Sequence, residues 1–268
     1  MQDNVIIPAS RWYSAIKTRR SRRQYDGQAI SPEVWAQLCK VCAEFQPFPG
    51  ARAVPIEDSP VDLYKGIVGS YGKIVSAPSF IAFIGDMDSP NVQEEIGYTG
   101  EGIILEAESL KLNTCWMGAF YRRDVAASFV EMKSSERIVA ISAVGYAVGI
   151  KSFGERLITG FGWTHRRKSL SSIADGLHES EWSKPVKDAL EAAKIAPSAT
   201  NRQPWIFTVT PDSITVSVNR PGMEFNVAKR LDCGIAMLHL EVSLLKHGIS
   251  GKWEFLKAPE VARFNFTG

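Results

Sequence analysis

The sequence predicts an α+β protein in which amphipathic helices alternate with short apolar strands. Apolar residues recur at helical spacing over 92–110, whereas 137–148 is a β-branched apolar run typical of a buried strand. Two further apolar runs, 205–210 and 213–218, flank Pro211-Asp212 in the pattern of a hairpin. The order of helix, proline-containing segment and strand also occurs twice, which indicates two related halves.

The elements of the first part follow from caps, prolines and periodicity. Ser10 is expected to cap a helix over 11–17, and Ser31-Pro32-Glu33 to open a stronger helix toward Phe45. Residues 46–60 contain several prolines and are expected to be irregular. The next elements predicted in order are a helix over 61–70, a strand over 80–84, the helix 92–110, a strand over 114–117, a helix over 122–130, the strand 137–148 and a glycine-rich loop over 148–164.

The second part is shorter and has the same order of elements. Ser183-Lys184-Pro185 opens a helix that runs to about residue 194, and the hairpin follows it. A helix over 232–246 ends at Gly248, and 252–255 forms a last strand. In each part a small-residue segment leads through a helix to a tryptophan, Trp116 or Trp253. The sequence therefore suggests two halves, 1–170 and 171–268, that form one intertwined unit.

Composition restricts the classes of protein that the chain can belong to. The 268 residues are 45% hydrophobic and 22% charged, with a net charge of +2, so the chain is typical of a soluble globular protein rather than a nucleic-acid or membrane binder. No apolar signal core begins the chain, and 138–150 is too short to span a bilayer. Cys39-x-x-Cys42 lies in a helical pattern and is expected to be two part-buried thiols. A cytoplasmic location is expected.

Two segments have the residue types of a ligand site. Residues 195–205 combine two prolines with Ser198, Thr200, Asn201 and Gln203, which suits a rigid backbone that binds a planar polar ligand. In an extended chain Arg19, Ser21 and Arg23 face the same side, and two guanidiniums beside a hydroxyl suit a phosphate. The alternative for this second segment is a solvated basic stretch.

Two further segments are weaker candidates. The small residues of Met117-Gly118-Ala119 would let backbone N–H groups approach a flat ring, or the segment is a turn packed by aromatics. Residues 165–168 (His-Arg-Arg-Lys) close a phosphate site or form a charged linker. The sequence contains no HExxH, Walker, GxGxxG or GxSxG motif. We therefore expect no catalytic side chain and no metal, and a cofactor that does the chemistry.

Together these segments resemble the FMN-dependent nitroreductase family. Residues 19–25 (Arg-Arg-Ser-Arg-Arg-Gln-Tyr) resemble its phosphate-binding signature, and 197–205 its Pro-Ser-x-x-Asn-x-Gln-Pro-Trp motif. Residues 114–120 are similar to its strand and turn beside the flavin N5, and 139–149 with 166–168 to its late strand and basic tail. The resemblance implies a three-layer α-β-α fold with a central, mainly antiparallel sheet flanked by helices.

One departure from the family pattern is large. Family members have the Pro-Ser motif soon after the Arg-Ser-Arg run, whereas 45–52 here lacks Ser and Asn, and the motif stands in the second half. That half has Glu179-Ser180-Glu181-Trp182 where an Arg-Ser-Arg run would be expected. Family members are homodimers with FMN between subunits. The resemblance therefore implies an internally duplicated, pseudo-dimeric chain that is a monomer and keeps one of two sites.

The resemblance also implies a function and a set of residues. FMN would accept electrons from NAD(P)H in a ping-pong reaction and pass them to a small electron-poor acceptor such as a nitroaromatic or a quinone. Two alternatives are a non-catalytic flavin-binding protein and a different flavin chemistry, dehalogenation or flavin fragmentation, on the same fold. The residues expected to bind the cofactor are Arg19, Arg20, Ser21, Arg23, Met117, Gly118, Ala119, Arg166, Lys168, Pro197, Ser198, Ala199 and Asn201.

Overall fold

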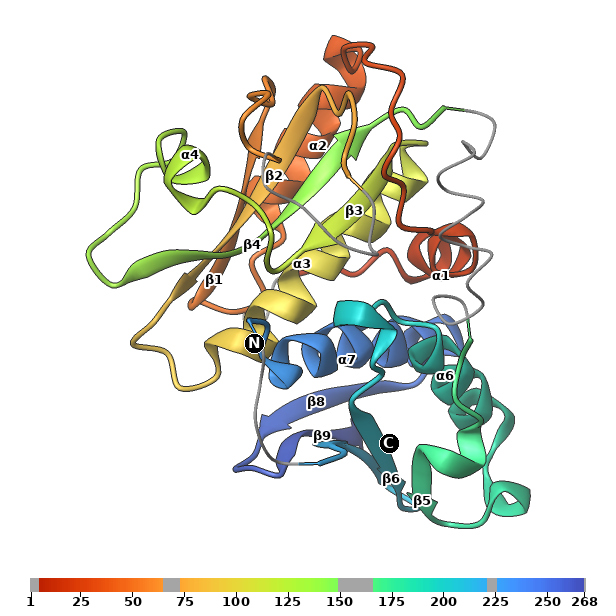
Figure 1. Cartoon of the computed structure of the whole chain (residues 1–268). Coiled ribbons are helices and arrows are strands. Elements are labelled where there is room, and N and C mark those ends of the chain that lie inside the picture. The colour runs from red at the N-terminus through yellow and green to blue at the C-terminus, as the bar shows by residue number, and fades with distance from the viewer. Residues whose placement is uncertain (1–4, 65–72, 149–165, 221–225, 268) are drawn as a thin grey trace.

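The chain folds into two β-sheets with a layer of helices between them (Figure 1). The computed structural model describes residues 5–64, 73–148, 166–220 and 226–267. The first sheet has the strand order β1-β2-β4-β3 and the second β5-β6-β7-β9-β8. All neighbours are antiparallel except β5 and β6. The strands are β1 (Ala51–Ile56), β2 (Ser79–Asp86), β3 (Asn113–Met117), β4 (Glu136–Gly145), β5 (Ala174–Gly176), β6 (Trp205–Val209), β7 (Ser213–Val218), β8 (Ser250–Phe255) and β9 (Glu260–Thr267).

The helices of the described residues differ in length and in place. They are α1 (Ala9–Thr18), α2 (Pro32–Glu44), α3 (Val92–Ser109), α4 (Arg123–Ala127), α6 (Lys184–Lys194) and α7 (Lys229–Lys246), with 3-10 turns at Leu170–Ser172, Glu179–Glu181 and Ala199–Asn201. Helices α3 and α7 each have 18 residues and are buried along most of their length. They lie between the two sheets, whereas α4 lies on the outer face of the first sheet (Figure 1).

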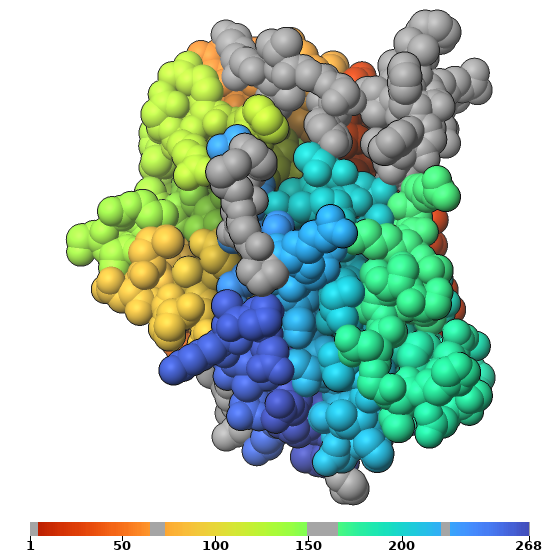
Figure 2. All heavy atoms as spheres, turned by 60° about the horizontal axis from the view of Figure 1, so that its bottom comes forward, coloured from red at the N-terminus to blue at the C-terminus, as the bar shows by residue number. Residues whose placement is uncertain are grey.

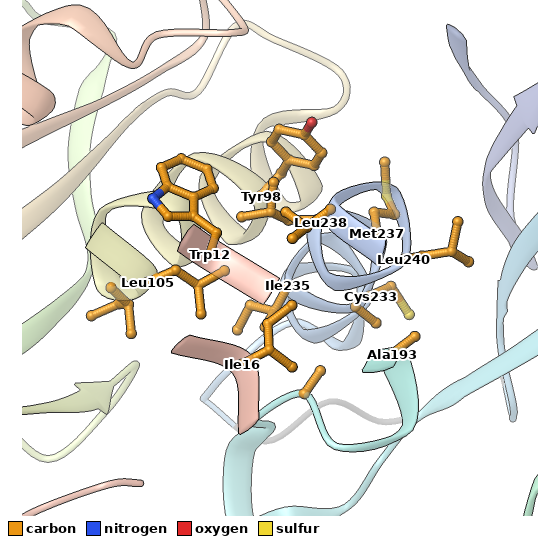
Figure 3. Packing of buried hydrophobic residues seen from close by; sticks show 14 of the residues in the cluster. Trp12, Ile16, Tyr98, Leu105, Ala193, Cys233, Ile235, Met237, Leu238 and Leu240 are labelled. Atoms are coloured by element: carbon orange, nitrogen blue, oxygen red, sulfur yellow. The ribbon is translucent and has the colours of Figure 1, made fainter. Parts of the chain in front are cut away.

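The main hydrophobic core is continuous across the two halves of the chain. Phe83 of β2 and Phe207 of β6 belong to the same buried cluster as the residues of α3 and α7. Figure 3 shows Trp12 of α1 and Tyr98 of α3 close to the aliphatic side chains of α7. In the space-filling view, residues of both halves adjoin over a broad contact (Figure 2). Burial of apolar surface in this one cluster therefore stabilises both halves together.

Helices α3 and α7 cross at two glycines. A Cβ atom on Gly97 would lie 2.0 Å from the carbonyl oxygen of Leu231, and one on Gly234 would lie 2.1 Å from that of Glu94. Both distances are far shorter than van der Waals contact, so only glycine allows the helices to approach this closely. The contacts are reciprocal. Gly97 faces the carbonyl oxygen of the residue three before Gly234, and Gly234 faces that of the residue three before Gly97.

Most elements predicted from the sequence are confirmed. The long helices, β2, β3, β4, β8 and the β6–β7 hairpin lie where their apolar patterns indicate. Ser31 Oγ accepts a hydrogen bond from the backbone N–H of Val34, and Ser183 Oγ accepts one from that of Val186. These are N-caps, which satisfy a backbone donor that the first helical turn leaves open. The fold class, α+β with mainly antiparallel strands, is also confirmed. The expected order of layers differs: in place of one central sheet flanked by helices, two sheets lie on either side of α3 and α7, because these two helices are buried along most of their length.

Three details were wrong. Helix α1 begins at Ala9, so Ser10 lies inside it and caps nothing. The segment 46–60 contains β1, whose Pro55 is tolerated because β1 is an edge strand and pairs only with β2. Strand β9 follows the predicted last strand and lies between β7 and β8. Where a helix was predicted over 61–70, residues 61–64 form a turn and 65–70 lie outside the described residues. The predicted loop over 148–164 also lies outside them, apart from Val148.

Two features of the composition are visible in the fold. Cys39 and Cys42 are free thiols of α2, with Cys42 buried and Cys39 partly buried, as expected. Burial raises the pKa of the Cys42 thiol, which makes it a poor nucleophile. Among the described helices, none combines the length and the apolar character needed to cross a membrane.

Glu241 of α7 is a buried carboxyl group whose titration should be measurable in the stability of the fold. Its Oε2 accepts hydrogen bonds from Tyr98 Oη at 2.5 Å and Trp253 Nε1 at 2.6 Å. Burial raises its pKa from 4.5 to about 7, although the two hydrogen bonds oppose the shift. Between these values the unfolded chain releases the proton and the native protein retains it, so stability falls as pH rises.

We expect the free energy of unfolding to fall by about 3 kcal/mol from this group between pH 4.5 and pH 7. Glu241→Gln should remove that part of the pH dependence, because the amide stays neutral. Urea unfolding of both proteins at pH 5, 6, 7 and 8 measures the difference. Glu254→Gln, which changes an exposed carboxylate, is the control. Parallel pH profiles for the wild type and Glu241→Gln would contradict the expectation.

Candidate functional site

The Pro-Ser segment forms a tight turn with unusual backbone geometry. It follows α6 and includes the 3-10 turn Ala199–Asn201. Thr200, Asn201 and Gln203 have φ of 54°, 56° and 47°, in the left-handed region. A left-handed backbone conformation in a residue other than glycine lowers stability by on the order of 1 kcal/mol or more. Residues in this conformation concentrate at ligand sites. The surrounding contacts must therefore hold the turn in place.

Asp232 at the start of α7 and Ser198 hold this turn. The Asp232 carboxylate accepts hydrogen bonds from the backbone N–H of Ala199 at 3.0 Å and from Arg202 Nε at 2.6 Å. Ser198 Oγ accepts one from the backbone N–H of Gln203 at 2.9 Å. Asp232 is 1% exposed, which strengthens its charge-assisted hydrogen bonds. The turn is thus fixed on the N-terminal end of α7.

The basic segment 166–168 binds the same turn through two amide side chains. Asn201 Nδ2 and Gln203 Nε2 each donate to the backbone oxygen of Arg166 at 3.0 Å. Gln203 Oε1 accepts from the backbone N–H of Lys168 at 2.8 Å. Lys168 Nζ donates to the Gln203 carbonyl at 2.7 Å, and burial lowers the pKa of this amine. The motif and the basic segment are therefore one hydrogen-bonded unit.

The N-terminal basic segment runs along the edge strand β3. Ser21 forms a parallel bridge with Thr114, and the backbone N–H of Arg22 donates to the Thr114 carbonyl at 2.9 Å. The segment is thus extended, as predicted. Arg19, at the end of α1, is buried at 5% exposure, whereas Arg20 is exposed and Ser21 and Arg23 are partly buried.

Arg167 connects the two basic segments. Its Nη1 donates to the Ala196 carbonyl at 2.8 Å and to Asn201 Oδ1 at 3.1 Å. Burial, followed by repulsion from Arg19 and Arg20, lowers its pKa to about 10. Arg167 is therefore repelled by two guanidiniums of a segment that is distant in the sequence. We name Arg19, Arg20 and Arg167 the arginine cluster. Positive charge concentrated where Arg19 is buried and Arg167 is partly buried is stabilised by an anion.

Behind Arg19 lies a buried polar network that joins α3 and α7. Glu101 Oε1 is 3.7 Å from Arg19 Nε and 2.8 Å from His239 Nε2. Glu101 Oε2 accepts a hydrogen bond from Trp116 Nε1 at 2.7 Å. Glu101 and His239 are both 0% exposed. Because Trp116 belongs to β3, the network also connects the helices to the strand that the basic segment follows.

The turn after β3 contacts the second half through Val227. A Cβ atom on Gly118 would lie 2.7 Å from Val227 Cγ2, so this glycine makes room for a side chain. Arg202 Nη2 donates to the Val227 carbonyl at 3.1 Å, and Arg202 also pairs with Asp232. The Met117 side chain belongs to the smaller buried cluster on the outer face of the first sheet.

A cavity of about 220 Å³ lies between the same halves but contains none of the predicted site residues. Its walls come from the start of α3, the start of β4 and the residues before and within the first turn of α7. The cavity shares Val227 with the β3 turn. We place the candidate site at the arginine cluster rather than in this cavity, because polar groups converge at the cluster.

The structure brings the predicted segments together but gives their residues different environments. Asn201, Ser198 and Lys168 lie in one hydrogen-bonded network. Arg19 lies near enough to this network to repel Arg167. The Arg166 side chain is exposed, and only its backbone oxygen bonds the motif. Sequence reasoning named Gln203 and Arg167 only as members of their segments, and it missed Asp232, Glu101 and His239 as site residues. Gln203 and Arg167 stand inside the quoted motifs, whereas no local pattern marks the other three.

Comparisons with known proteins agree with this fold. A family model described as "Putative TM nitroreductase" matches residues 11–244. A crystal structure of a "putative nitroreductase" from Thermotoga maritima is 18% identical, covers 96% of this chain and 94% of that chain, and has a TM-score of 0.65. An FMN-dependent nitroreductase from Clostridium difficile is 20% identical and covers 51% of this chain and 88% of that chain, with a TM-score of 0.44. No curated protein matches the sequence.

The fold is that of the nitroreductase type of structure. The family model extends over more than half of the sequence, so the chain belongs to the nitroreductase family.

Proposed function

We propose that this chain is an FMN-dependent oxidoreductase that transfers electrons from NAD(P)H to a small electron-poor acceptor. The observation that carries the proposal is Arg167, which bonds the Pro-Ser turn and is repelled by Arg19 and Arg20. It joins the two segments whose motifs resemble the phosphate and ring-binding parts of the family. Among the solved structures similar to this chain, one is described as an FMN-dependent nitroreductase and another as an oxidoreductase containing FMN.

The donor groups of the site fit a phosphate-bearing cofactor. Guanidiniums bind phosphate oxygens in bidentate fashion, and the arginine cluster offers three of them. Arg19 Nε is buried and has no hydrogen-bond acceptor among the described residues. Buried donors nearly always have an acceptor, so this atom supports the proposal that an anionic ligand binds here. The left-handed turn is a second sign of a preorganised ligand site.

Each segment has a role in this proposal. Arg19, Arg20, Ser21, Arg23 and Arg167 would hold the phosphate side, and Arg166 and Lys168 would add positive charge. Pro197, Ser198, Ala199 and Asn201 would line the ring and the ribityl chain, with Met117, Gly118 and Ala119 at its other edge. Bound FMN would supply two-electron transfer between the reduced nicotinamide and the acceptor. The protein would bind these two substrates in turn, as the resemblance implies, and needs no side-chain acid.

We also propose that the chain is internally duplicated, with halves near 1–170 and 171–268, and works as a pseudo-dimeric monomer. Helices α3 and α7 have equal length and make reciprocal glycine contacts. Trp116 and Trp253 follow them at equal distances along the chain, and each indole donates to a buried glutamate, Glu101 or Glu241. Each half also provides one sheet.

One of the two pseudo-symmetric sites is proposed to be closed. The segment of the first half that corresponds to the Pro-Ser turn contains Phe45 and Phe48, which are buried. Phe45 stacks on Tyr98 with ring centroids 6.3 Å apart, and Phe48 contacts Tyr98 and Phe255 at 5.2 and 5.3 Å. In this proposal, these aromatic side chains would take the space of a second cofactor.

Purified protein is expected to bind one FMN per chain and to elute from gel filtration as a monomer. Anaerobic addition of NADH or NADPH should abolish the visible absorbance of the bound flavin, and an electron-poor quinone should restore it. Retained absorbance with both nicotinamides would show a flavin-binding protein without this activity. A protein that binds no FMN at micromolar concentration, or two per chain, would contradict the proposed site.

A further inference from the structure

Arg19 is a buried guanidinium whose ion pair with Glu101 includes no hydrogen bond from Nε. Its Nε has no hydrogen-bond acceptor among the described residues, although Glu101 Oε1 lies 3.7 Å away. That separation exceeds the 2.7–3.2 Å range of N–H···O hydrogen bonds. The carboxylate therefore lies close enough to attract Arg19 but does not accept a hydrogen bond from Nε.

Two other donors hold the Glu101 carboxylate in this position. Trp116 Nε1, which can only donate, bonds Oε2 at 2.7 Å. His239 Nε2 bonds Oε1, the oxygen nearer to Arg19, at 2.8 Å. The side chains of Glu101 and His239 are each 0% exposed, so water is excluded from them and these two bonds fix the carboxylate.

The hydrogen bonds of His239 determine how many protons the pair holds. Its Nδ1 is 3.0 Å from the carbonyl oxygen of Ala192, which can only accept, so Nδ1 carries a proton. The bond between Nε2 and Glu101 Oε1 needs one further proton, on either atom. In both cases His239 and Glu101 together carry no net charge. The positive charge of Arg19 is then not cancelled by its nearest carboxylate.

We propose that His239 is a positioning residue that neutralises Glu101 and so keeps Arg19 available to the anion at the arginine cluster. This inference rests on the proposed function in taking that anion to be the FMN phosphate. Without the shared proton, Glu101 would be a full anion beside Arg19 in a water-free interior. Coulomb attraction in such surroundings would close the gap and take Arg19 from the ligand.

Glu241 offers a matched comparison inside the same molecule. It is buried on α7 as Glu101 is on α3, and it also accepts a hydrogen bond from an indole, that of Trp253. Its second donor is the Tyr98 hydroxyl rather than a histidine. Glu241→Gln therefore replaces a buried carboxyl group by an amide, as Glu101→Gln does, but without affecting Arg19.

The test compares four variants with the wild type in FMN titrations followed by flavin fluorescence. His239→Gln keeps a donor near Glu101 but removes the shared proton, and we expect Kd to rise about tenfold, equivalent to 1.4 kcal/mol. Glu101→Gln removes the competing carboxylate, so its Kd should equal or fall below that of the wild type. The double variant should recover wild-type affinity within about threefold, which is about 0.65 kcal/mol. Glu241→Gln should bind as the wild type does.

Recovery in the double variant is the readout that a purely structural role would not give, because structural damage would add up. Thermal unfolding without ligand shows whether each variant is folded. Wild-type affinity in His239→Gln, or a double variant as weak as His239→Gln, would overturn the inference. If the wild type binds no FMN, the proposed function fails instead. The same proteins are then titrated with inorganic phosphate by calorimetry, where the same order of affinities is expected and any other order overturns the inference.

Discussion

Replacing Arg167 with alanine is expected to weaken FMN binding about 100-fold, because a charge-assisted hydrogen bond contributes roughly 1.5–3 kcal/mol and the turn also loses an anchor. Arg167 contacts both the Ala196 carbonyl and Asn201 Oδ1. The substitution therefore removes one of the three charges of the arginine cluster and loosens the Pro-Ser turn. Equilibrium dialysis of FMN, or fluorescence quenching, measures the change in Kd.

Two further proteins make the Arg167 experiment specific. Arg167→Lys keeps the charge but loses the planar fork, so its affinity should lie between those of the wild type and Arg167→Ala. Arg263→Ala removes an arginine of β9 that pairs with Glu254 on the second sheet, and should leave Kd unchanged. Equal FMN affinity in Arg167→Ala and Arg263→Ala would show that the arginine cluster is not the anion site.

The second large effect is expected at Asp232, whose loss should both destabilise the protein and abolish FMN binding. Asp232→Ala leaves Arg202 and the backbone N–H of Ala199 without their buried acceptor. Removing one partner of a buried ion pair costs about 3–5 kcal/mol. The left-handed turn at Thr200, Asn201 and Gln203 would then relax, because its cost is no longer offset. Urea unfolding and FMN titration measure the two effects separately.

Glu94→Ala is the matched control for Asp232→Ala. The Glu94 side chain is 1% exposed and pairs with Arg230, much as the Asp232 side chain, which is 2% exposed, pairs with Arg202. Both substitutions should lower the free energy of unfolding by a similar amount. Below the unfolding transition, only Asp232→Ala should lose FMN, because Glu94 bonds no part of the Pro-Ser turn among the described residues. Loss of FMN to the same degree in both variants would mean that stability alone explains the effect.

Local sequence patterns predicted most of the elements for clear physical reasons. Helix α2 begins at Ser-Pro and α6 at Ser-x-Pro. The serine side chain accepts a hydrogen bond from a free backbone N–H, and the φ of proline fits the first turn of a helix. The β6–β7 hairpin follows from two apolar runs around a turn. Strand β1 was missed because its proline argues against a strand unless the strand lies at an edge, and that position depends on the whole sheet.

The candidate site was predictable only in part. Short motifs identified the basic segment and the Pro-Ser turn, because the residues of each motif are neighbours in the sequence. The partners that fix them are distant. Asp232 bonds Ala199 from the next helix, and His239 reaches Glu101 across the α3–α7 contact. A lone acid or histidine in a helix has no sequence pattern that names its partner, so these residues could not be found.

The sequence by itself determined the class of fold, the order of its elements and the family resemblance, since propensity, capping and motifs depend on neighbouring residues. Tertiary structure decided which charges meet. Arg19 and Arg167 come from opposite ends of the first half, yet the folded chain brings them close enough to repel each other, and Arg167 also bonds the Pro-Ser turn of the second half. Electrostatic interactions depend on distance in space rather than along the chain, so only the folded structure reveals the arginine cluster and the buried network behind it.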